Sequence, residues 1–331
     1  MKPLEPDNPP ARYFPPRNGR YRVAVGLSAL GRDFGNGPAD ARALQLDRAF
    51  GHYRREKLRA RGERLGKYWC RDRPSPRALG AAHRWCLERL SREYPRYFRL
   101  REDRQGLHLH CELTGERLHF DDRGGWQGAE AGVEPAYGAG LDALACQVQE
   151  DLALMELDEA GRDRISALHL CFPNHWAAED KIGGDFSAIH RPVAGFGPIA
   201  RQHGSLVDTL VQRGPFVRFA WGLATDRRLN HHPVAPPGSE PRQWAGRRFD
   251  ADQSRLYLRV ERQVLWGLPQ ARACLFTIRT YLTDCADLAP DRRTALGAAV
   301  AGMDRATLDY KGLNADRDAL IAWLMAPERT G

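Results

Sequence analysis

The histidines are the first residues of this chain that could do chemistry, and the sequence contains 11 of them. Imidazole is a common ligand for transition metals, and its charge changes near neutral pH. His190 lies in the motif IHRPV, within a long irregular segment between apolar elements. Gly183, Gly184 and Gly195 in the same segment permit a close approach of the backbone to a ligand. This setting is typical of a loop that fits around a planar ligand, although spacing alone favours a structural histidine.

A second group of histidines lies in residues 107–120, where LHLHCEL and RLHF flank a TGE turn. Alternation along a strand places His108 and His110 on one face, and His119 comes close to them across the turn. In outline this resembles a three-histidine metal site, but no carboxylate stands at a fixed supporting spacing. The alternative interpretation is a polar strand face.

Charged side chains alternate with apolar ones in two strand-like runs, which flank a short turn in residues 256–284. The polar positions are Tyr257, Arg259, Glu261 and Gln263 in the first run and Thr277, Arg279 and Tyr281 in the second. If the turn is centred near Gln270, antiparallel pairing sets Glu261 opposite Arg279 and leaves Arg262 on the other face. We therefore expect Glu261 and Arg279 to act together, with a surface ion pair as the alternative.

Composition limits the class of protein. Lys and Arg total 50 against 42 for Asp and Glu, a formal charge of +8 that would attract anions. Most of these cations are Arg, so genomic composition is a better explanation than nucleic-acid binding. The seven cysteines form no C-x-x-C pair, which argues against a zinc ribbon or an iron–sulfur cluster and predicts reduced, mostly buried thiols.

Several recognisable motifs are missing from the sequence. It contains no G-x-S-x-G elbow, no G-x-x-x-x-G-K-[ST] phosphate loop, no H-E-x-x-H helix and no G-x-G-x-x-G dinucleotide fingerprint. The N-terminus has Pro and charge where a signal peptide needs an apolar core, and no run approaches about 18 apolar residues. We therefore expect a cytoplasmic protein without membrane contact.

The elements that must position these residues follow a mixed pattern. Helices are predicted over 41–67, 77–93, 141–157, 199–213 and 290–327, and strands over 107–120, 165–172, 217–226 and 256–284. This order predicts an α+β fold in which helices cover an antiparallel sheet mainly on one face, as in a PAS-like core. We expect an N-terminal arm and basic helical extension over 1–100, the core over 101–285, and a C-terminal helical extension over 286–331.

Four blocks of the sequence resemble one known family in their order and spacing. They are CFPNHWAAEDKIGGDFSAIHRPVAGF, VRFAWGL, LRVERQVLWGLP and ACLFTIRTYL, which lie within residues 140–284, with a weaker echo at YKGL. Together they resemble the haem-dependent oxidative N-demethylase α-subunit-like proteins. The matching positions are Lys181, Gly183, Ile189, His190, Pro192, Val193, Gly195, Arg259, Glu261, Arg262, Gln263, Leu268, Pro269, Phe276, Thr277, Arg279 and Tyr281.

The resemblance implies an enzyme that uses haem and dioxygen to oxidise a small amine. An N-methyl group would be oxidised, and the resulting carbinolamine would collapse to formaldehyde and a demethylated amine. Electrons would come from a separate NADPH-dependent reductase subunit with flavin and an iron–sulfur cluster, because this chain has neither a nucleotide fingerprint nor clustered cysteines. The oxidative chemistry would belong to the cofactor, which the protein orients and tunes.

The same resemblance assigns roles to particular residues. His190 becomes the preferred axial ligand of the haem iron, and Lys181, Arg262 and Arg279 become candidates for binding the haem propionates. Glu261 and Trp221 are the candidate catalytic residues. Glu261 could hold an amine, orient a proton path or simply pair with Arg279.

Two departures from the family pattern leave alternatives open. This chain has Ala220 before Trp221, where the family usually has Asn, and PVAG replaces the more usual PVPG. If that Asn contacts the substrate or the distal oxygen, its loss would change specificity, so dimethylamine is not secured as the substrate. A non-catalytic PAS-like sensor of haem or a small ligand is the main alternative function. A basic nucleic-acid-binding protein is a weaker one, because no aromatic and basic platform supports it.

Overall fold

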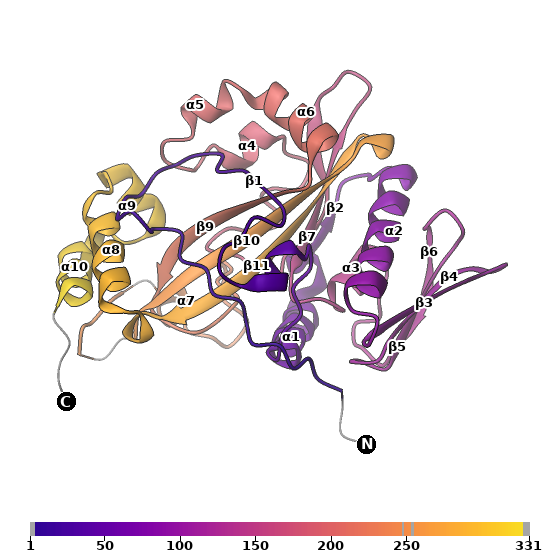
Figure 1. Cartoon of the computed structure of the whole chain (residues 1–331), viewed down its shortest axis with the longest axis horizontal. Helices are drawn as coiled ribbons and strands as arrows, with labels where there is room; N and C mark the ends of the chain where they lie inside the picture. The colour runs from indigo at the N-terminus through magenta and orange to yellow at the C-terminus, as the bar shows by residue number, and fades with distance from the viewer. Residues whose placement is uncertain (1–3, 247, 253–254, 327–331) are drawn as a thin grey trace.

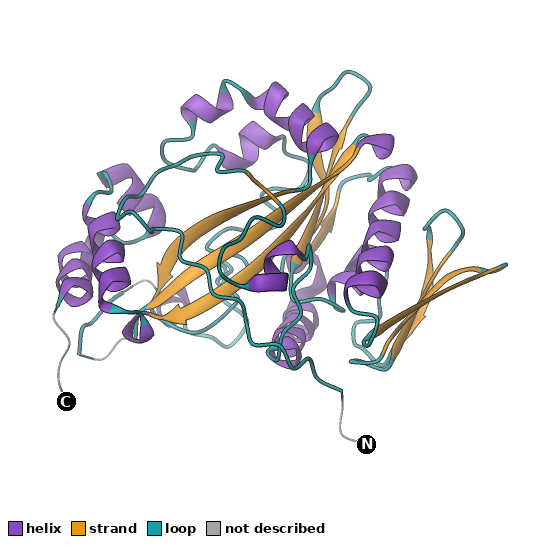
Figure 2. Cartoon of the chain, in the orientation of Figure 1, coloured by secondary structure: helices purple, strands orange, loops and turns teal. Residues whose placement is uncertain are grey.

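The computed structural model describes residues 4–246, 248–252 and 255–326. Residues 1–3, 247, 253–254 and 327–331 lie outside the described residues, and they include the first residues of the predicted arm and the last of the predicted C-terminal extension. The described chain forms two antiparallel sheets with helices around them (Figures 1 and 2), which confirms the predicted α+β class. None of the described helices has the length and apolar character needed to cross a membrane.

The larger sheet has seven strands in the order β1-β9-β10-β11-β7-β8-β2, and all of its neighbouring pairs are antiparallel. Its strands are β1 (Ser28–Ala29), β2 (Trp69–Arg71), β7 (Asp151–Leu157), β8 (Asp163–His169), β9 (Phe216–Ala224), β10 (Tyr257–Leu268) and β11 (Ala273–Asp284). The long hairpin β10–β11 lies in the middle of the sheet, so most of its side chains are buried on both faces.

The smaller sheet has four strands in sequence order, namely β3 (Phe98–Asp103), β4 (Gly106–Cys111), β5 (Glu116–Phe120) and β6 (Trp126–Glu130). The pairing of β4 with β5 confirms the predicted hairpin at 107–120. Leu107, Leu109, Leu118 and Phe120 are buried in the core, while the side chains between them form the opposite face.

Helices link and cover the sheets. They are α1 (Phe50–Tyr68), α2 (Pro76–Glu93), α3 (Gly140–Ala145), α4 (Phe186–His190), α5 (Gly197–Ala200), α6 (His203–Arg213), α7 (Pro241–Ala245), α8 (Pro290–Ala301), α9 (Arg305–Lys311) and α10 (Arg317–Met325), with short 3₁₀ turns at Gly37–Ala41, Pro269–Ala271, Cys285–Asp287 and Asn314–Asp316. In Figure 1, α4, α5 and α6 lie along one side of the large sheet, and α2 and α3 lie between the two sheets.

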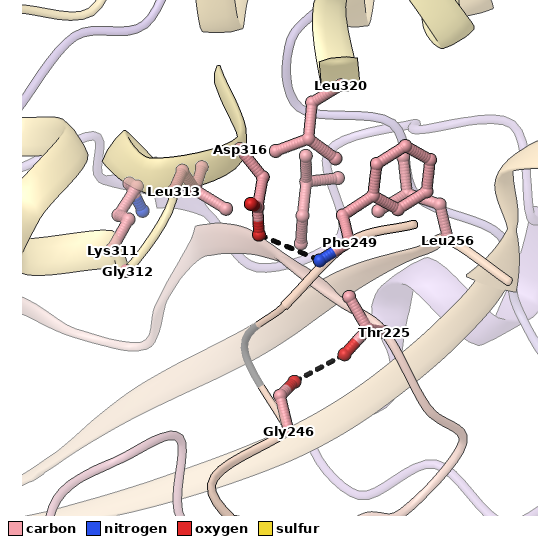
Figure 3. A pocket seen from close by; sticks show the side chains of 10 residues that line it. Thr225, Gly246, Phe249, Leu256, Lys311, Gly312, Leu313, Asp316 and Leu320 are labelled. Atoms are coloured by element: carbon pink, nitrogen blue, oxygen red, sulfur yellow. Dashed lines mark hydrogen bonds between the residues drawn. The ribbon is translucent and has the colours of Figure 1, made fainter. Parts of the chain in front are cut away.

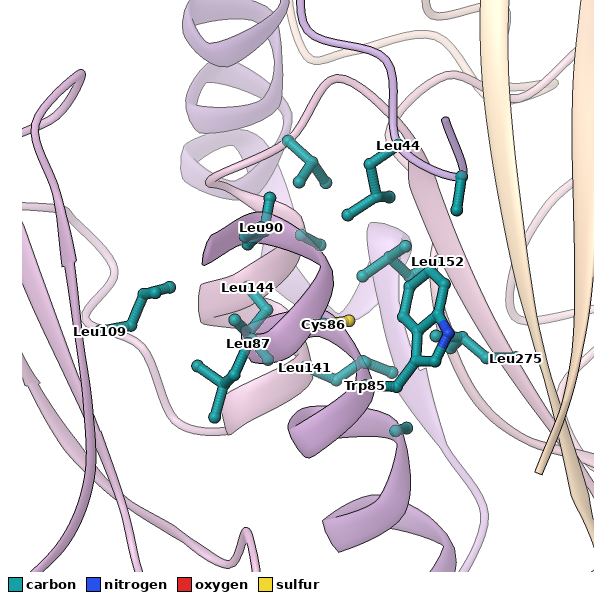
Figure 4. Packing of buried hydrophobic residues seen from close by; sticks show 14 of the residues in the cluster. Leu44, Trp85, Cys86, Leu87, Leu90, Leu109, Leu141, Leu144, Leu152 and Leu275 are labelled. Atoms are coloured by element: carbon teal, nitrogen blue, oxygen red, sulfur yellow. The ribbon is translucent and has the colours of Figure 1, made fainter. Parts of the chain in front are cut away.

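Helix α2 joins the two sheets into one core. Ser75 caps its first turn by accepting a hydrogen bond from the Ala78 N–H at 3.1 Å, and Pro76 follows at the first helical position, where its fixed φ suits a helix start. Trp85 and Leu87 of α2 pack among Leu144, Leu152 and other apolar side chains, as Figure 4 shows. The seven cysteines are free and six of them are buried, as the sequence predicted.

The C-terminal helices close one end of the hairpin. The Asp316 carboxylate accepts the Phe249 N–H at 2.8 Å, and the Thr225 hydroxyl donates to the Gly246 carbonyl (Figure 3). The cavity that these residues line has a volume of only about 10 Å³, which is room for about one water molecule. The described residues at this end of the sheet are therefore closely packed.

The helix predicted over 141–157 is wrong in its second half. The structure has the short helix α3 at Gly140–Ala145 and then strand β7 at Asp151–Leu157. Strand β7 lies between β11 and β8, and its first six residues are all buried. A strand buried on both faces shows no alternation of polar and apolar residues, so Leu152 and Met155 fitted a helical spacing by coincidence.

The predicted register of the β10–β11 hairpin is also wrong, by one residue. Arg262 pairs directly with Arg279, and Glu261 pairs with Thr280. The connection is a 3₁₀ turn followed by Arg272 in the left-handed region (φ 50°), which moves the centre of the hairpin past Gln270. Because side chains alternate with a period of two, the shift places Glu261 and Arg279 on opposite faces.

Candidate functional site

The register of β9, β10 and β11 divides their side chains between two faces. One face packs against the apolar residues of α4 and α6, and we call it the loop face. It carries Arg218, Ala220, Arg259, Glu261, Gln263 and Thr280. The other, which we call the arm face, packs against the N-terminal segment and α8–α10. It carries Phe219, Trp221, Val260, Arg262, Arg279 and Tyr281.

His190 ends helix α4 on the side of the loop face. The helix begins at Asp185, whose carboxylate accepts the Ala188 N–H at 2.7 Å. The Nδ1 atom of His190 lies 2.8 Å from the Phe186 carbonyl oxygen, which can only accept, so Nδ1 carries the proton. The ring stacks on Phe196 with centroids 5.0 Å apart. These contacts fix both the tautomer and the ring orientation, as the supporting shell of a metal-bound histidine does.

His190 is uncharged at neutral pH. Burial lowers its pKa to about 4, and the positive charges of Arg218 and Lys181 act in the same direction. The Nε2 atom therefore keeps a free lone pair, and no hydrogen bond to it is made by any residue that the structure describes. A neutral imidazole with one anchored nitrogen and one free nitrogen is the form that binds a metal.

This low pKa predicts a pH dependence of stability. The unfolded chain takes up a proton at His190 near pH 6.5 but the folded chain only near pH 4. The neutral His190 side chain thus makes its full contribution to the free energy of unfolding above about pH 6.5. This contribution is lost as the pH falls toward 4. We expect the unfolding free energy of the haem-free chain to decrease less between pH 7 and pH 5 in His190→Gln than in the wild type, as measured by urea titration. Equal decreases in both proteins would contradict the depressed pKa.

Two cations lie close to His190. Burial lowers the pKa of both Arg218 and Lys181. Lys181 Nζ donates to the Ile189 carbonyl at 2.7 Å. The Nε of Arg218 is buried without a hydrogen-bond partner, and none of the described carboxylates forms an ion pair with this guanidinium. The Arg218 side chain is half-buried, and a partly desolvated cation without an ion pair favours binding of an anionic group.

Glu261 brings a carboxylate to the same face. It is 9% exposed, its Oε2 accepts a hydrogen bond from Gln263 Nε2 at 3.1 Å, and its charge raises the pKa of Arg218 against the effect of burial. Ala220 is its direct neighbour on β9, and Arg218 lies opposite Gln263. Ala220, the position before Trp221 at which this chain departs from the family pattern, therefore lies beside Glu261.

The other predicted site residues lie on the arm face. Arg262 donates to backbone carbonyls of the N-terminal segment, with Arg42 at 2.8 Å, and Arg279 forms a buried ion pair with Asp47 at 2.8 Å. Trp221 packs edge-on against Tyr21 with ring centroids 5.6 Å apart. The structure thus brings His190, Lys181 and Glu261 to one side of the sheet and leaves Arg262, Arg279 and Trp221 on the other.

Arg218 is the residue that the sequence reasoning missed. It stands in the block VRFAWGL, and alternation along β9 places it on the same face as Ala220. The alternation could be read from the sequence. It connects Arg218 with the site only once the strand register shows that Glu261 lies on the same face. Arg259 is on the loop face too, where its guanidinium donates to the carbonyls of Leu229 (2.9 Å) and Phe172 (2.7 Å) and so ties the covering loops to the sheet.

A second cluster of ligand-type side chains lies deep in the core around His169. Asp142 and Cys146 lie on one side of its ring and Asp151 and Cys171 on the other. Asp142 already binds Arg61 through two 2.8 Å hydrogen bonds, and Asp151 accepts two backbone N–H groups. Although burial alone would lower it, the neighbouring thiols and carboxylates raise the pKa of His169 well above its usual value. Both carboxylates of this cluster are thus already engaged, Asp142 by Arg61 and Asp151 by backbone N–H groups.

One family model matches the chain over residues 38–321, a region that contains every residue of the loop face described above. Its description is haem-dependent oxidative N-demethylase, alpha subunit-like. The match confirms the resemblance seen in the sequence.

Proposed function

Because the chain belongs to the haem-dependent oxidative N-demethylase, alpha subunit-like family, we propose that it binds haem against the loop face and oxidises a small amine. The observation that carries this proposal is His190, a neutral imidazole with Nδ1 anchored and Nε2 free, beside the half-buried cation Arg218, whose Nε has no hydrogen-bond partner among the described residues. An imidazole ligand and buried cations are the donor set that an iron porphyrin with two propionates requires.

His190 Nε2 would bind the iron, and Arg218 and Lys181 would bind the propionates. Arg218 replaces Arg262 and Arg279 in this role, because those two are held by the N-terminal segment on the arm face. When bound, haem would supply the activation of dioxygen needed to oxidise an N-methyl group. Electrons would come from a separate NADPH-dependent reductase with flavin and an iron–sulfur cluster.

Glu261 would bind the amine substrate. Small secondary amines are protonated at neutral pH, so a carboxylate held by Gln263 offers them a charged hydrogen-bond acceptor. Ala220 places only a methyl group beside this carboxylate, which leaves room for a larger amine than an Asn at the same position would. We also propose that β9, β10 and β11, with the helices that cover them, form a PAS-like core.

The test is a haem titration followed by an assay for formaldehyde. We expect the purified full-length chain to bind one haem with a Soret band. Reduced and aerated in the presence of N-methyl secondary amines, it is expected to release formaldehyde in proportion to amine consumed. Haem binding without formaldehyde, with an active reductase present, would favour a sensor and contradict the enzymatic proposal. A chain that binds no haem would contradict both.

Arg218→Met provides a sharper test of the propionate site. Since hydrogen bonds to charged groups contribute about 1.5–3 kcal/mol, we expect haem affinity to fall roughly 10-fold or more without a change of Soret position, because His190 remains. Arg213→Met, at the exposed end of α6, is the matched control. Unchanged haem affinity in Arg218→Met would exclude it from the site.

A further inference from the structure

The outward face of the small sheet presents two histidines to each other. His108 of β4 and His119 of β5 are direct partners in the antiparallel register, and their Nδ1 atoms lie 2.8 Å apart. The two side chains are 21% and 27% exposed, so solvent reaches them. This face plays no part in the site proposed for haem, which lies on the other sheet.

Each imidazole has a carboxylate at its other nitrogen. His108 Nε2 lies 3.1 Å from Asp103 Oδ1, and His119 Nε2 lies 3.3 Å from Glu130 Oε1. A carboxylate can only accept, so each Nε2 carries a proton. If both rings are neutral, each Nδ1 then has a lone pair, and the two lone pairs point at each other across 2.8 Å. That arrangement is repulsive unless a cation lies between them.

We propose that His108 and His119 together bind a divalent transition-metal ion through their Nδ1 atoms. With metal–nitrogen bonds of about 2.0–2.1 Å, two ligands at a tetrahedral angle lie about 3.3–3.4 Å apart. The two rings, whose centroids are 5.0 Å apart, would have to separate and turn so that both Nδ1 lone pairs converge on the ion. Imidazole ligands suit zinc, nickel and copper, and not magnesium or calcium. The carboxylates of Asp103 and Glu130 hold the two rings as the supporting groups of a histidine metal site do.

The surroundings leave the remaining coordination positions open. An open hollow of about 490 Å³ lies over the pair, and its other lining residues include Arg99, Arg101 and Arg117. Their side chains are 73%, 79% and 57% exposed. Each of these arginines forms an ion pair with a carboxylate of the same face, Glu112, Asp103 or Glu130 in that order. The ion would therefore complete its coordination with water. His110 lies in the same hollow, but it faces Glu112 at 3.4 Å and pairs across the strands with Arg117.

Calorimetric titration of the full-length chain with zinc chloride tests this site. We expect one zinc ion per chain, no binding of magnesium, and at least about 10-fold weaker zinc binding in both His119→Asn and Asp103→Asn. His110→Asn is the matched control and should bind zinc as the wild type does, and so should His190→Ala. With Cu²⁺ in place of zinc, electron paramagnetic resonance should show two nitrogen ligands in the wild type and one in His119→Asn.

Two results would overturn the proposal. If the wild type binds no zinc, or if His119→Asn and His108→Asn bind it as tightly as the wild type, the cation between the rings is a proton. In that case ¹⁵N spectra of the histidines would show one protonated and one neutral ring sharing a hydrogen bond. The substituted side chains are partly exposed, so circular dichroism is expected to show an unchanged fold in every variant.

Discussion

The His190→Ala variant is expected to lose more than about 100-fold in haem affinity, and its residual complex should lack the Soret band of the wild type. Loss of a group that only supports a metal ligand costs about 10–100-fold in metal affinity, so loss of the ligand itself should cost more. The absorption spectrum during a haem titration measures both effects. The fold should persist, because among the described residues this ring makes one hydrogen bond, to the carbonyl of Phe186 in the same short helix.

A matched control comes from the same cluster of rings. His203 stacks on Phe186 at 6.1 Å between centroids, but its Nε2 is engaged by Asp163 at 2.5 Å. His203→Ala should therefore keep haem affinity within a few-fold of the wild type. Adding free imidazole to His190→Ala should restore the wild-type spectrum, because it refills the vacated space with the same ligand. A wild-type Soret band in His190→Ala without imidazole would show that another residue binds the iron.

Asp47→Ala is expected to lower the free energy of unfolding by about 3–5 kcal/mol, the usual result of removing one partner from a buried ion pair. Asp47 and Arg279 have side chains 4% and 1% exposed and lie 2.8 Å apart. The Arg279 guanidinium also lies 3.8 Å from the ring centroid of Tyr53, where it cannot reach water. Removing the carboxylate leaves this cation buried without its charge partner. Urea denaturation followed by circular dichroism measures the loss.

The double variant Asp47→Ala, Arg279→Met separates the charge from the packing. It should recover part of the stability, because the uncompensated cation is removed as well. Glu88→Ala, which breaks an exposed pair with Arg92 on α2, should change stability by less than about 1 kcal/mol. The double variant should also bind haem as the wild type does, because Arg279 lies on the arm face. Stability that is unchanged in Asp47→Ala, or haem affinity that falls in the double variant, would contradict the structural role of the pair.

Local patterns in the sequence were sufficient for much of the architecture. Alternation identified β4, β5, β10 and β11, helical spacing identified α2 and α6, and the four quoted blocks identified the family. The glycine-rich segment around His190 drew attention to this residue, and the resemblance to the family made it the preferred ligand. These are properties of neighbouring residues, and they do not depend on which distant segment packs against them.

The faces of the central sheet could not be assigned in this way. Nothing in the turn at Pro269–Ala271 marks its centre, since the left-handed position is occupied by Arg272 and not by glycine. A one-residue error there exchanged the faces of Glu261 and Arg279. For the same reason, the sequence did not show that Arg218 shares a face with Glu261. That placement depends on the register between β9 and β10.

The sequence by itself determined the family and the mixed fold, because both rest on the identity and order of nearby residues. The ligand role of His190, which follows from the resemblance to that family, stays a prediction. Only the tertiary structure decided which cations share a face with His190 and which are held by Asp47 and the N-terminal segment. It also decided that the carboxylates of Asp103 and Glu130 contact the Nε2 atoms of the paired histidines of the small sheet. These outcomes depend on strand register and long-range packing, which join residues far apart in the chain and leave no local pattern.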